Sequence, residues 1–350
     1  NMNNFKKIGL TALAASLVST SVFAGEMAVT GKAKINWENY SGTAKDTTKS
    51  FSMGNQLTFS GSGELDNGMN VSLSFVLDQN DDSSKAGAAN KGAPFDSHSV
   101  TISSDAMGTL VFHGEGGDSA QNAVGDTAAG NIWDNFDKRV TGAAKLSESS
   151  AGDNIMHYTL PSMVDGVAVS ASYTPAGGND ESSAAYALVY TGVEGLTLSY
   201  GQGSSDGQAA GSGGSTANAD TTSMKASYVY GSVTLAYSDH EHDSNTTTSD
   251  QDATSWKVSY TVSDAISVSY GSEELDSNGA ADTSDAEYTK ISTSYTSGGM
   301  TVSANYQEAE NMSYTTAVGE DEEYYGLSLS FAFLSLIHIS EPTRLLSISY

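Results

Sequence analysis

Residues 50–78 read SFSMGNQLTFSGSGELDNGMNVSLSFVLD, and this stretch decides the fold. Apolar side chains occupy most alternate positions on both sides of the triplet DNG at residues 66–68. A period of two residues is typical of a β-strand with one apolar and one polar face. A short turn rich in Asp, Asn and Gly between two such runs is typical of a hairpin. The stretch therefore predicts two antiparallel strands joined by a tight turn.

The same unit recurs along the whole chain. Sixteen strands are expected, near residues 26–39, 50–65, 69–78, 97–103, 109–115, 153–160, 167–174, 183–190, 196–202, 221–230, 233–239, 253–262, 265–271, 286–295, 300–306 and 323–333. Tight turns such as 231–232 and 263–264 alternate with long polar loops such as 79–96 and 203–220. An even strand number with short turns on one rim and long loops on the other predicts a transmembrane antiparallel up-and-down β-barrel.

A soluble β-sandwich also alternates, so two further patterns decide between these folds. Tyrosines close strand after strand, as expected of an aromatic girdle at a lipid–water interface. The strand lysines Lys32, Lys34, Lys225, Lys257 and Lys290 all fall on the polar parity. A charge facing lipid at mid-depth costs about 2 to 4 kcal/mol, so this placement favours the barrel.

Composition narrows the partners. The chain has 15 Lys and Arg against 42 Asp and Glu, a net charge of −27, and no cysteine. Nucleic-acid binding needs clustered basic residues, so we expect no nucleic-acid partner. Disulfides cannot stabilise the fold. Outer-membrane lipid is the expected surrounding of such a barrel, and loosely held Ca²⁺ or Mg²⁺ is expected at its acidic surface loops.

Both ends of the chain differ from its middle. Residues 2–24 have a basic start, a short apolar run and the small-residue box Val22-Phe23-Ala24, which predicts a secretory signal peptide. Residues 25–333 are the expected barrel. Phe331 and Phe333 end its last alternating run, which resembles the terminal aromatic signal for outer-membrane assembly. Residues 334–350 continue no earlier pattern and are similar to a translated sequencing adapter, so we exclude them as non-native.

The runs GTLVFHGEGG at 108–117 and DNIMHYTLPSMVDGVAVSASYTP at 153–175 resemble the segments that flank the third loop of Gram-negative general porins. The resemblance covers nearly all of 25–333 and implies a homotrimer in the outer membrane of a Gram-negative bacterium. It also implies a long third loop, residues 116–152, folded into the lumen. The chain lacks the Pro-Glu-Phe-Gly-Gly stretch that the family often carries in this loop. The implied function is a water-filled channel for passive diffusion of ions and small hydrophilic solutes.

In such porins a constriction sets loop acids against bases on the facing wall. The resemblance places Asp118, Asp126, Asp134 and Asp137 on the loop, and Lys32 and Lys34 on the wall. No strand carries an arginine, and acidic rings in a lumen favour positive ions, so we expect a cation-biased pore. His113 falls on the lumen parity and is expected to be a plain wall residue.

Sequence motifs for metal binding or catalysis are weaker than the pattern of the barrel. The run DHEHD at 239–243, expected in an external loop, lacks the ligand set of a zinc site, so we expect no metal centre. Nothing singles out a nucleophile with its base, so we expect no catalytic residues and no enzyme. The alternatives are a non-channel or enzymatic outer-membrane barrel, and a secreted acidic calcium-binding β protein, which would need a nonapeptide repeat that is absent.

Overall fold

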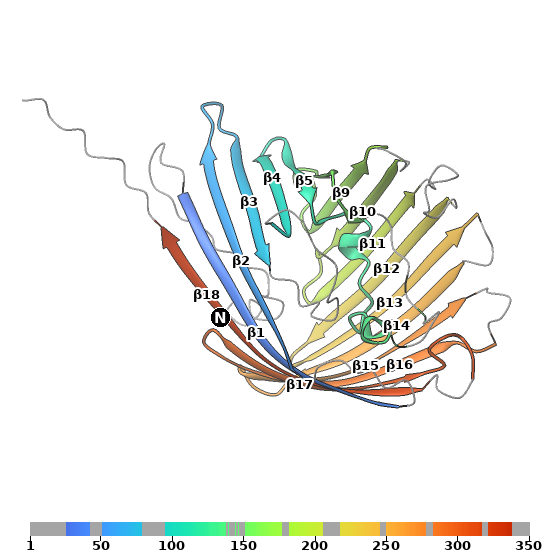
Figure 1. Cartoon of the computed structure of the whole chain (residues 1–350). Helices are drawn as coiled ribbons and strands as arrows, with labels where there is room; N and C mark the ends of the chain where they lie inside the picture. The colour runs from blue at the N-terminus through green and yellow to red at the C-terminus, as the bar shows by residue number, and fades with distance from the viewer. Residues whose placement is uncertain are drawn as a thin grey trace, which may run out of the picture.

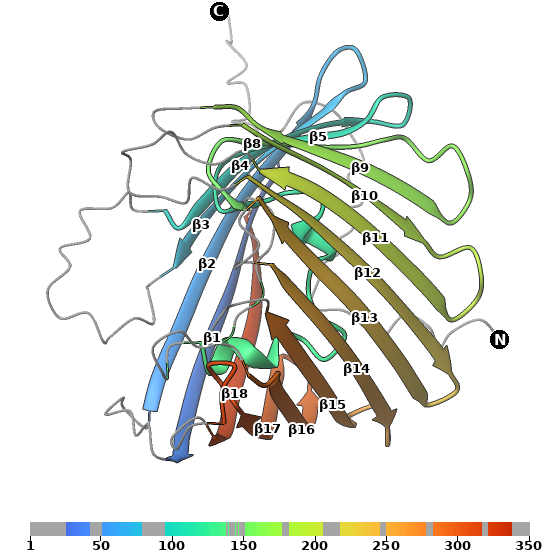
Figure 2. The same ribbon diagram turned by 90° about the vertical axis from the view of Figure 1, so that its right-hand side faces the viewer.

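The structure of the chain, a computed structural model, describes residues 26–42, 51–78, 95–137, 139, 144, 146, 151–176, 182–205, 218–245, 250–277, 283–316 and 321–337. Within them, sixteen strands form one closed antiparallel barrel (Figures 1 and 2). The barrel strands are β1 (Glu26–Gly42), β2 (Phe51–Glu64), β3 (Asn70–Asp78), β4 (Ser97–Ser104), β5 (Gly108–Glu115), β8 (Ile155–Thr159), β9 (Val167–Thr174), β10 (Ser183–Tyr190), β11 (Leu196–Ser205), β12 (Ala219–Tyr230), β13 (Val233–Ser244), β14 (Gln251–Thr261), β15 (Ile266–Ser277), β16 (Ala286–Ser297), β17 (Met300–Glu310) and β18 (Glu322–Ile337). The remaining elements are the short strands β6 (Gly117–Asp118) and β7 (Ala151–Gly152) and the 3₁₀ turns η1 (Asn122–Val124) and η2 (Ile132–Asn135).

Closure joins the two ends of the described chain. β1 pairs with β18 from Met27 opposite Ile337 to Gly42 opposite Glu322, while every other strand pairs with its neighbours along the sequence. A closed sheet leaves no unpaired edge, so its backbone polar groups are satisfied within the wall. The predicted fold class and strand number are confirmed.

Several strand boundaries differ from expectation. β15 and β17 continue to Ser277 and Glu310, six and four residues beyond their expected ends. β13 continues to Ser244, so residues 239–243 belong to a strand and not to an external loop. β18 continues to Ile337, four residues beyond the expected end at Phe333, because ladder bonds to β1 require only backbone groups. Phe333 lies outward with its ring across Gly31, where an added Cβ would clash with the ring. The signal role of Phe331 and Phe333 stays a prediction, as do the origins of 2–24 and 334–350; residues 2–24 and 338–350 lie outside the described residues.

Inward and outward side chains of the wall alternate in character. Tyr237 and Trp256 are 51% and 43% exposed, whereas the adjacent Ser238 and Ser255 are 0% and 1% exposed. Outward tyrosines recur on most strands from β9 to β18, as the girdle predicts. The serines are buried because another part of the chain covers the inner face of the wall. No helix in the described residues has the length and apolarity needed to cross a bilayer.

Candidate pore constriction

The connection between β5 and β8 leaves the wall through a short two-stranded neck. Gly116 turns the chain at φ 68°, a left-handed conformation that favours glycine. β6 then pairs with β7, with Gly117 opposite Gly152. Residues 117–137, which begin with β6 of the neck, form together with Arg139, Ala144 and Leu146 what we call the inner segment. Figures 1 and 2 show its turns η1 and η2 within the ring of strands.

Serine hydroxyls on the wall anchor the backbone of the inner segment. The N–H groups donate from Ala120 to Ser172 at 2.8 Å, from Ala128 to Ser238 at 2.8 Å and from Ala129 to Ser255 at 2.9 Å. These serines lie on β9, β13 and β14, so the segment crosses several strands in succession. A typical net contribution of about 1 kcal/mol per bond makes the series a substantial anchor.

Two glycines let the inner segment approach the wall closely. A Cβ added at Gly201 would lie 2.7 Å from Cγ2 of Val124, and one added at Gly271 would lie 2.9 Å from Cβ of Ala129. Any side chain at either position would therefore displace the segment towards the pore axis.

Glu273 of β15 is a buried polar anchor of the inner segment. Its carboxylate is 1% exposed and accepts hydrogen bonds from the hydroxyl of Thr127 and, at 3.1 Å, from the N–H of Trp133. The Thr127 hydroxyl oxygen in turn accepts from the N–H groups of Gly130 and Asn131 at 3.1 and 2.8 Å. A buried carboxylate is stable only where such donors replace water, so Glu273 and the turn around Thr127 depend on each other.

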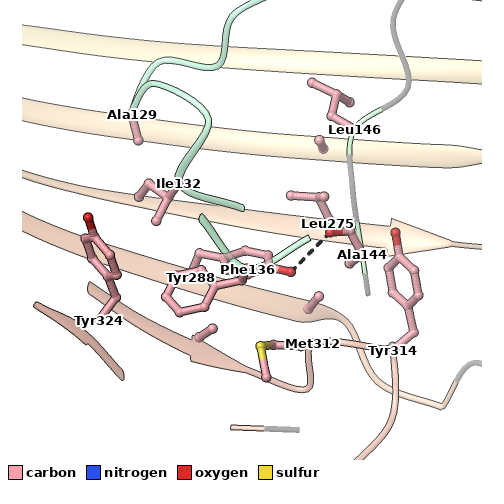
Figure 3. Packing of buried hydrophobic residues seen from close by; sticks show 13 residues of the cluster. Ala129, Ile132, Phe136, Ala144, Leu146, Leu275, Tyr288, Met312, Tyr314 and Tyr324 are labelled. Carbon is pink, nitrogen blue, oxygen red and sulfur yellow. Dashed lines mark hydrogen bonds between the residues drawn. The ribbon is translucent and has the colours of Figure 1, made fainter. Parts of the chain in front are cut away.

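An apolar cluster holds the second 3₁₀ turn (Figure 3). Ile132, Phe136, Tyr288 and Met312 are each fully buried, and the rings of Phe136 and Tyr288 lie 5.8 Å apart. The N–H of Ala144 donates to the carbonyl of Met312 at 2.6 Å. The largest buried cluster of the described residues thus lies inside the barrel, between the inner segment and the wall.

Arg139 ties the inner segment to the closing strands. Its Nε and Nη2 donate to the two carboxylate oxygens of Glu322 at 2.7 and 2.5 Å. The guanidinium also stacks over the Tyr40 ring at 3.9 Å. The two charged side chains are 4% and 0% exposed. Arg139 is therefore neutralised in the wall and does not present a free charge to the lumen.

The four predicted loop acids all lie on the inner segment. Asp118 accepts from the Asn122 amide at 3.0 Å, and Asp126 accepts from the Asn131 amide at 2.9 Å. Asp118, Asp126 and Asp134 are exposed and Asp137 is partly exposed. Their place on the segment fits the expectation, while their role in the constriction stays a prediction.

The predicted wall bases lie on β1, which the inner segment contacts further along the strand. Lys32 and Lys34 are exposed on the polar parity of β1, but the segment meets β1 at Tyr40, whose hydroxyl donates to the carbonyl of Asn135 at 3.1 Å. Six residues of extended strand separate Tyr40 from Lys34, roughly 20 Å. The role of Lys32 and Lys34 opposite the loop acids therefore stays a prediction.

Three other lysines lie near the inner segment. Lys225 of β12 donates to the carbonyl of Asp126 at 2.8 Å. Lys257 of β14 and Lys290 of β16 lie opposite Gly271 of β15, one on each side, and Gly271 packs under Ala129. Parity alone marked these lysines as inward. Their closeness to the inner segment depends on the register between neighbouring strands, which cannot be predicted from this sequence alone.

The histidines do not form a metal centre. His240 points inward, is 3% exposed and lies 2.9 Å through Nδ1 from the Ser223 hydroxyl. Its neighbours Asp239 and Glu241 face the other side of β13, because side chains alternate along a strand. The described residues contain no group of three or more His, Cys, Asp or Glu side chains placed to hold a metal ion.

A sequence model of Gram-negative porins matches residues 9–334. No curated protein matches the chain. Among solved structures, the chain is similar to an anion-selective porin from Comamonas acidovorans, with a TM-score of 0.64 and 15% identity over 89% of this chain and 100% of that chain. A trimer form of OmpT from Vibrio cholerae gives 0.61 and 14% over 89% and 100%. A triple mutant of the Rhodopseudomonas blastica porin gives 0.59 and 13% over the same shares. At these identities the structures establish the shared barrel fold.

Proposed function

Because this chain belongs to the Gram-negative porin family, we propose that it lets ions and small hydrophilic solutes diffuse passively through a water-filled lumen narrowed by the inner segment. The observation that carries the proposal is the anchoring of residues 117–137 across the inner face of a closed barrel. The mechanism needs no reaction and no energy input, since a hydrophilic path through the barrel lowers the barrier that hydrocarbon presents to polar solutes.

The family and the outer-membrane location agree with the sequence predictions and are confirmed. Family and fold point to a channel and not to an enzyme. The alternative of a secreted calcium-binding repeat protein is incompatible with membership of a porin family. The finer properties, namely selectivity, oligomeric state and cation binding, are proposals that rest on the residues below.

A cation-biased pore is supported by the charges that the inner segment presents. Asp118, Asp126 and Asp134 are exposed, whereas Arg139 is neutralised by Glu322. The remaining wall bases are lysines, whose hydrated ammonium groups lack the rigid fork of arginine. The Comamonas acidovorans porin is anion-selective, but it shares only 15% identity with this chain.

Planar-bilayer recording in a KCl gradient should give a reversal potential of the sign that marks cation preference. Asp126→Asn combined with Asp134→Asn should lower the cation-to-anion permeability ratio roughly twofold, equivalent to about 0.4 kcal/mol. Asp66→Asn, at an exposed hairpin turn, makes the same kind of charge change on the rim and should leave the ratio unchanged. Anion preference in the unmodified protein would overturn the selectivity proposal, and absence of conductance would overturn the channel.

A homotrimer is supported by a difference between the outer surface of β1 to β4 and that of the remaining strands. The outward side chains of β1 to β4 include Ile35, Phe51, Met53 and Leu73, and the described part of these strands carries no outward tyrosine. Tyrosine girdles belong where protein meets the lipid interface. The outer surface of β1 to β4, which lacks the girdle, therefore suits contact with other subunits. One structurally similar protein, OmpT from Vibrio cholerae, is described in a trimer form.

Loose binding of Ca²⁺ or Mg²⁺ is supported by carboxylates that face one another outside the barrel, beyond the girdle on the long-loop side. The facing pairs are Asp220 and Asp243, Glu241 and Asp252, Asp252 and Asp276, Glu274 and Glu287, Glu287 and Glu310, and Glu308 and Glu323. Like charges opposite one another destabilise a sheet. Partial burial and nearby Asp276 and Glu287 raise the pKa of Asp285 above its usual range, which reflects the same crowding. Divalent cations would relieve this repulsion.

One sample tests both proposals. In mild detergent the protein should elute at the size of three subunits and resist dissociation until heated. Replacing Ca²⁺ with EDTA should lower its unfolding temperature by on the order of 5 °C. Glu274→Gln with Glu287→Gln should shrink this Ca²⁺ effect, whereas Asp105→Asn in an exposed turn should preserve it. A monomer would contradict the trimer, and equal stability in Ca²⁺ and EDTA would contradict cation binding.

A further inference from the structure

The wall below the inner segment contains a hydroxyl-lined recess. It has a volume of about 230 Å³ and lies on β15, β16 and β17. Thr293 and Ala304 line it from the outward parity, and the rest of its lining is polar: Ser267, Ser269, Ser292, Ser294, Ser303, Asn305 and Lys290. These positions share the inward parity of Glu273, Tyr288 and Gln307, so the recess opens to the lumen. Pockets for drug-sized ligands measure roughly 300–1,000 Å³, so this recess suits a smaller solute.

The serine hydroxyls are paired across the strands. Ser267 and Ser294 are 2.7 Å apart, and Ser269 and Ser292 are also 2.7 Å apart. In each pair one hydroxyl donates to the other, and the second O–H remains to donate elsewhere. Each pair therefore offers a guest one donor as well as acceptor lone pairs.

Asn305 is held in place from the inner segment. The Asn135 amide donates to Oε1 of Gln307 at 2.9 Å, and Nε2 of Gln307 donates to Oδ1 of Asn305 at 2.7 Å. With its oxygen engaged, Asn305 keeps its amide hydrogens for a guest. The polar lining of the recess is thus connected to the segment that narrows the pore.

Lys290 supplies the charge. It lies in the register opposite Gly271, which pairs with Lys257 on its other side; of the two lysines, Lys290 lines the recess. Glu273, opposite Tyr288, lies two residues further along β15, but its carboxylate accepts from Thr127 and Trp133 of the inner segment. The local balance of these three groups is positive within an otherwise acidic protein.

We propose that this recess binds small hydroxylated oxyanions during passage, with Lys290 holding the anionic group and the paired serines and Asn305 holding the hydroxyls. The inference rests on the proposed channel function and names a solute class for it. An ammonium group suits a carboxylate or a phosphate equally, since both present oxyanion acceptors. The acidic groups of the pore repel anions, and the contacts with Lys290, the serines and Asn305 would offset this repulsion for such solutes.

The test uses four probes on the full protein in a planar bilayer. D-glycerate and glycerol 3-phosphate carry both groups, propionate carries the charge without hydroxyls, and glycerol carries hydroxyls without charge. Glycerate or glycerol 3-phosphate should reduce the K⁺ current saturably, with half-saturation on the order of 1 mM, a binding free energy of about −4 kcal/mol. Propionate and glycerol should be at least tenfold weaker. The better of the two hydroxylated anions identifies the preferred anionic group.

Ser269→Ala with Ser292→Ala keeps all charges and should weaken the block by glycerate at least tenfold, as should Lys290→Gln. The matched control is Ser72→Ala with Ser74→Ala, on the inward parity of β3. Glycerate should block this variant as strongly as it blocks the unmodified protein. Normal KCl conductance of each variant reports that its barrel has formed. A conducting channel that glycerate and glycerol 3-phosphate block no better than propionate would overturn the site. Calorimetric binding of glycerate without any conductance would instead overturn the channel and leave the site standing.

Discussion

Glu273→Ala should raise the single-channel conductance by roughly half or more and increase the current noise of the open state. The change removes the acceptor for the Thr127 hydroxyl and the Trp133 N–H, which are held against the wall by that carboxylate. Leaving buried donors unsatisfied costs about 1 to 3 kcal/mol each, so the inner segment would partly leave the wall of β15. A segment that is no longer fixed obstructs the lumen less completely, and its motion modulates the current.

The control for this experiment is the next residue along the same strand. Glu274 faces outward, so Glu274→Ala removes the same group from the opposite side of β15 and should leave conductance unchanged. Unaltered conductance and noise in Glu273→Ala would show that the carboxylate does not fix the constriction.

Arg139→Leu should lower the unfolding free energy of the barrel by about 3 to 5 kcal/mol, because it leaves the Glu322 carboxylate buried without its partner. This corresponds to a fall in unfolding temperature on the order of 10 °C. The effect should exceed that of surface substitutions because both side chains are almost fully buried and their contact is bidentate. Thermal unfolding followed by circular dichroism or by heat-dependent gel mobility measures it.

The double variant Arg139→Leu with Glu322→Leu separates pairing from packing. Removing both charges should recover most of the lost stability, since a buried ion pair and an apolar pair of similar volume are often close in free energy. Glu310→Leu, an exposed acid on β17, is the surface control. Equal stability of Arg139→Leu and the unmodified protein would contradict the structural role of the pair.

The strands could be predicted from the sequence because apolar and polar side chains alternate along each of them. The run from Phe51 to Asp78 specifies its own hairpin, and register within a hairpin follows from its turn. β13 was too short in the expectation because Asp239 to Asp243 is polar on both parities above the membrane, where no apolar face marks a strand. β18 was too short because backbone pairing with β1 continues past the last outward aromatic residue.

Only part of the constriction could be predicted from the sequence. The acids Asp118, Asp126, Asp134 and Asp137 could be assigned to the loop, but its anchors could not. Ala128 binds Ser238, 110 residues away, and serines are too frequent for one of them to be singled out by composition. Lys225, Lys257 and Lys290 could be assigned to the inward face, whereas their position beside the inner segment depends on sixteen strands in register.

The pairing of Arg139 with Glu322 also fixes an order of assembly. Apart from Tyr40 of β1, the anchors of the inner segment lie on strands that are synthesised after it, and the last of them, Glu322, begins the strand that closes on β1. Contacts between positions so far apart in the chain form late, because the intervening chain must first be ordered. The constriction therefore gains its last anchor only when the closing strand β18 is in place, and a barrel that lacks this strand would hold the inner segment less firmly.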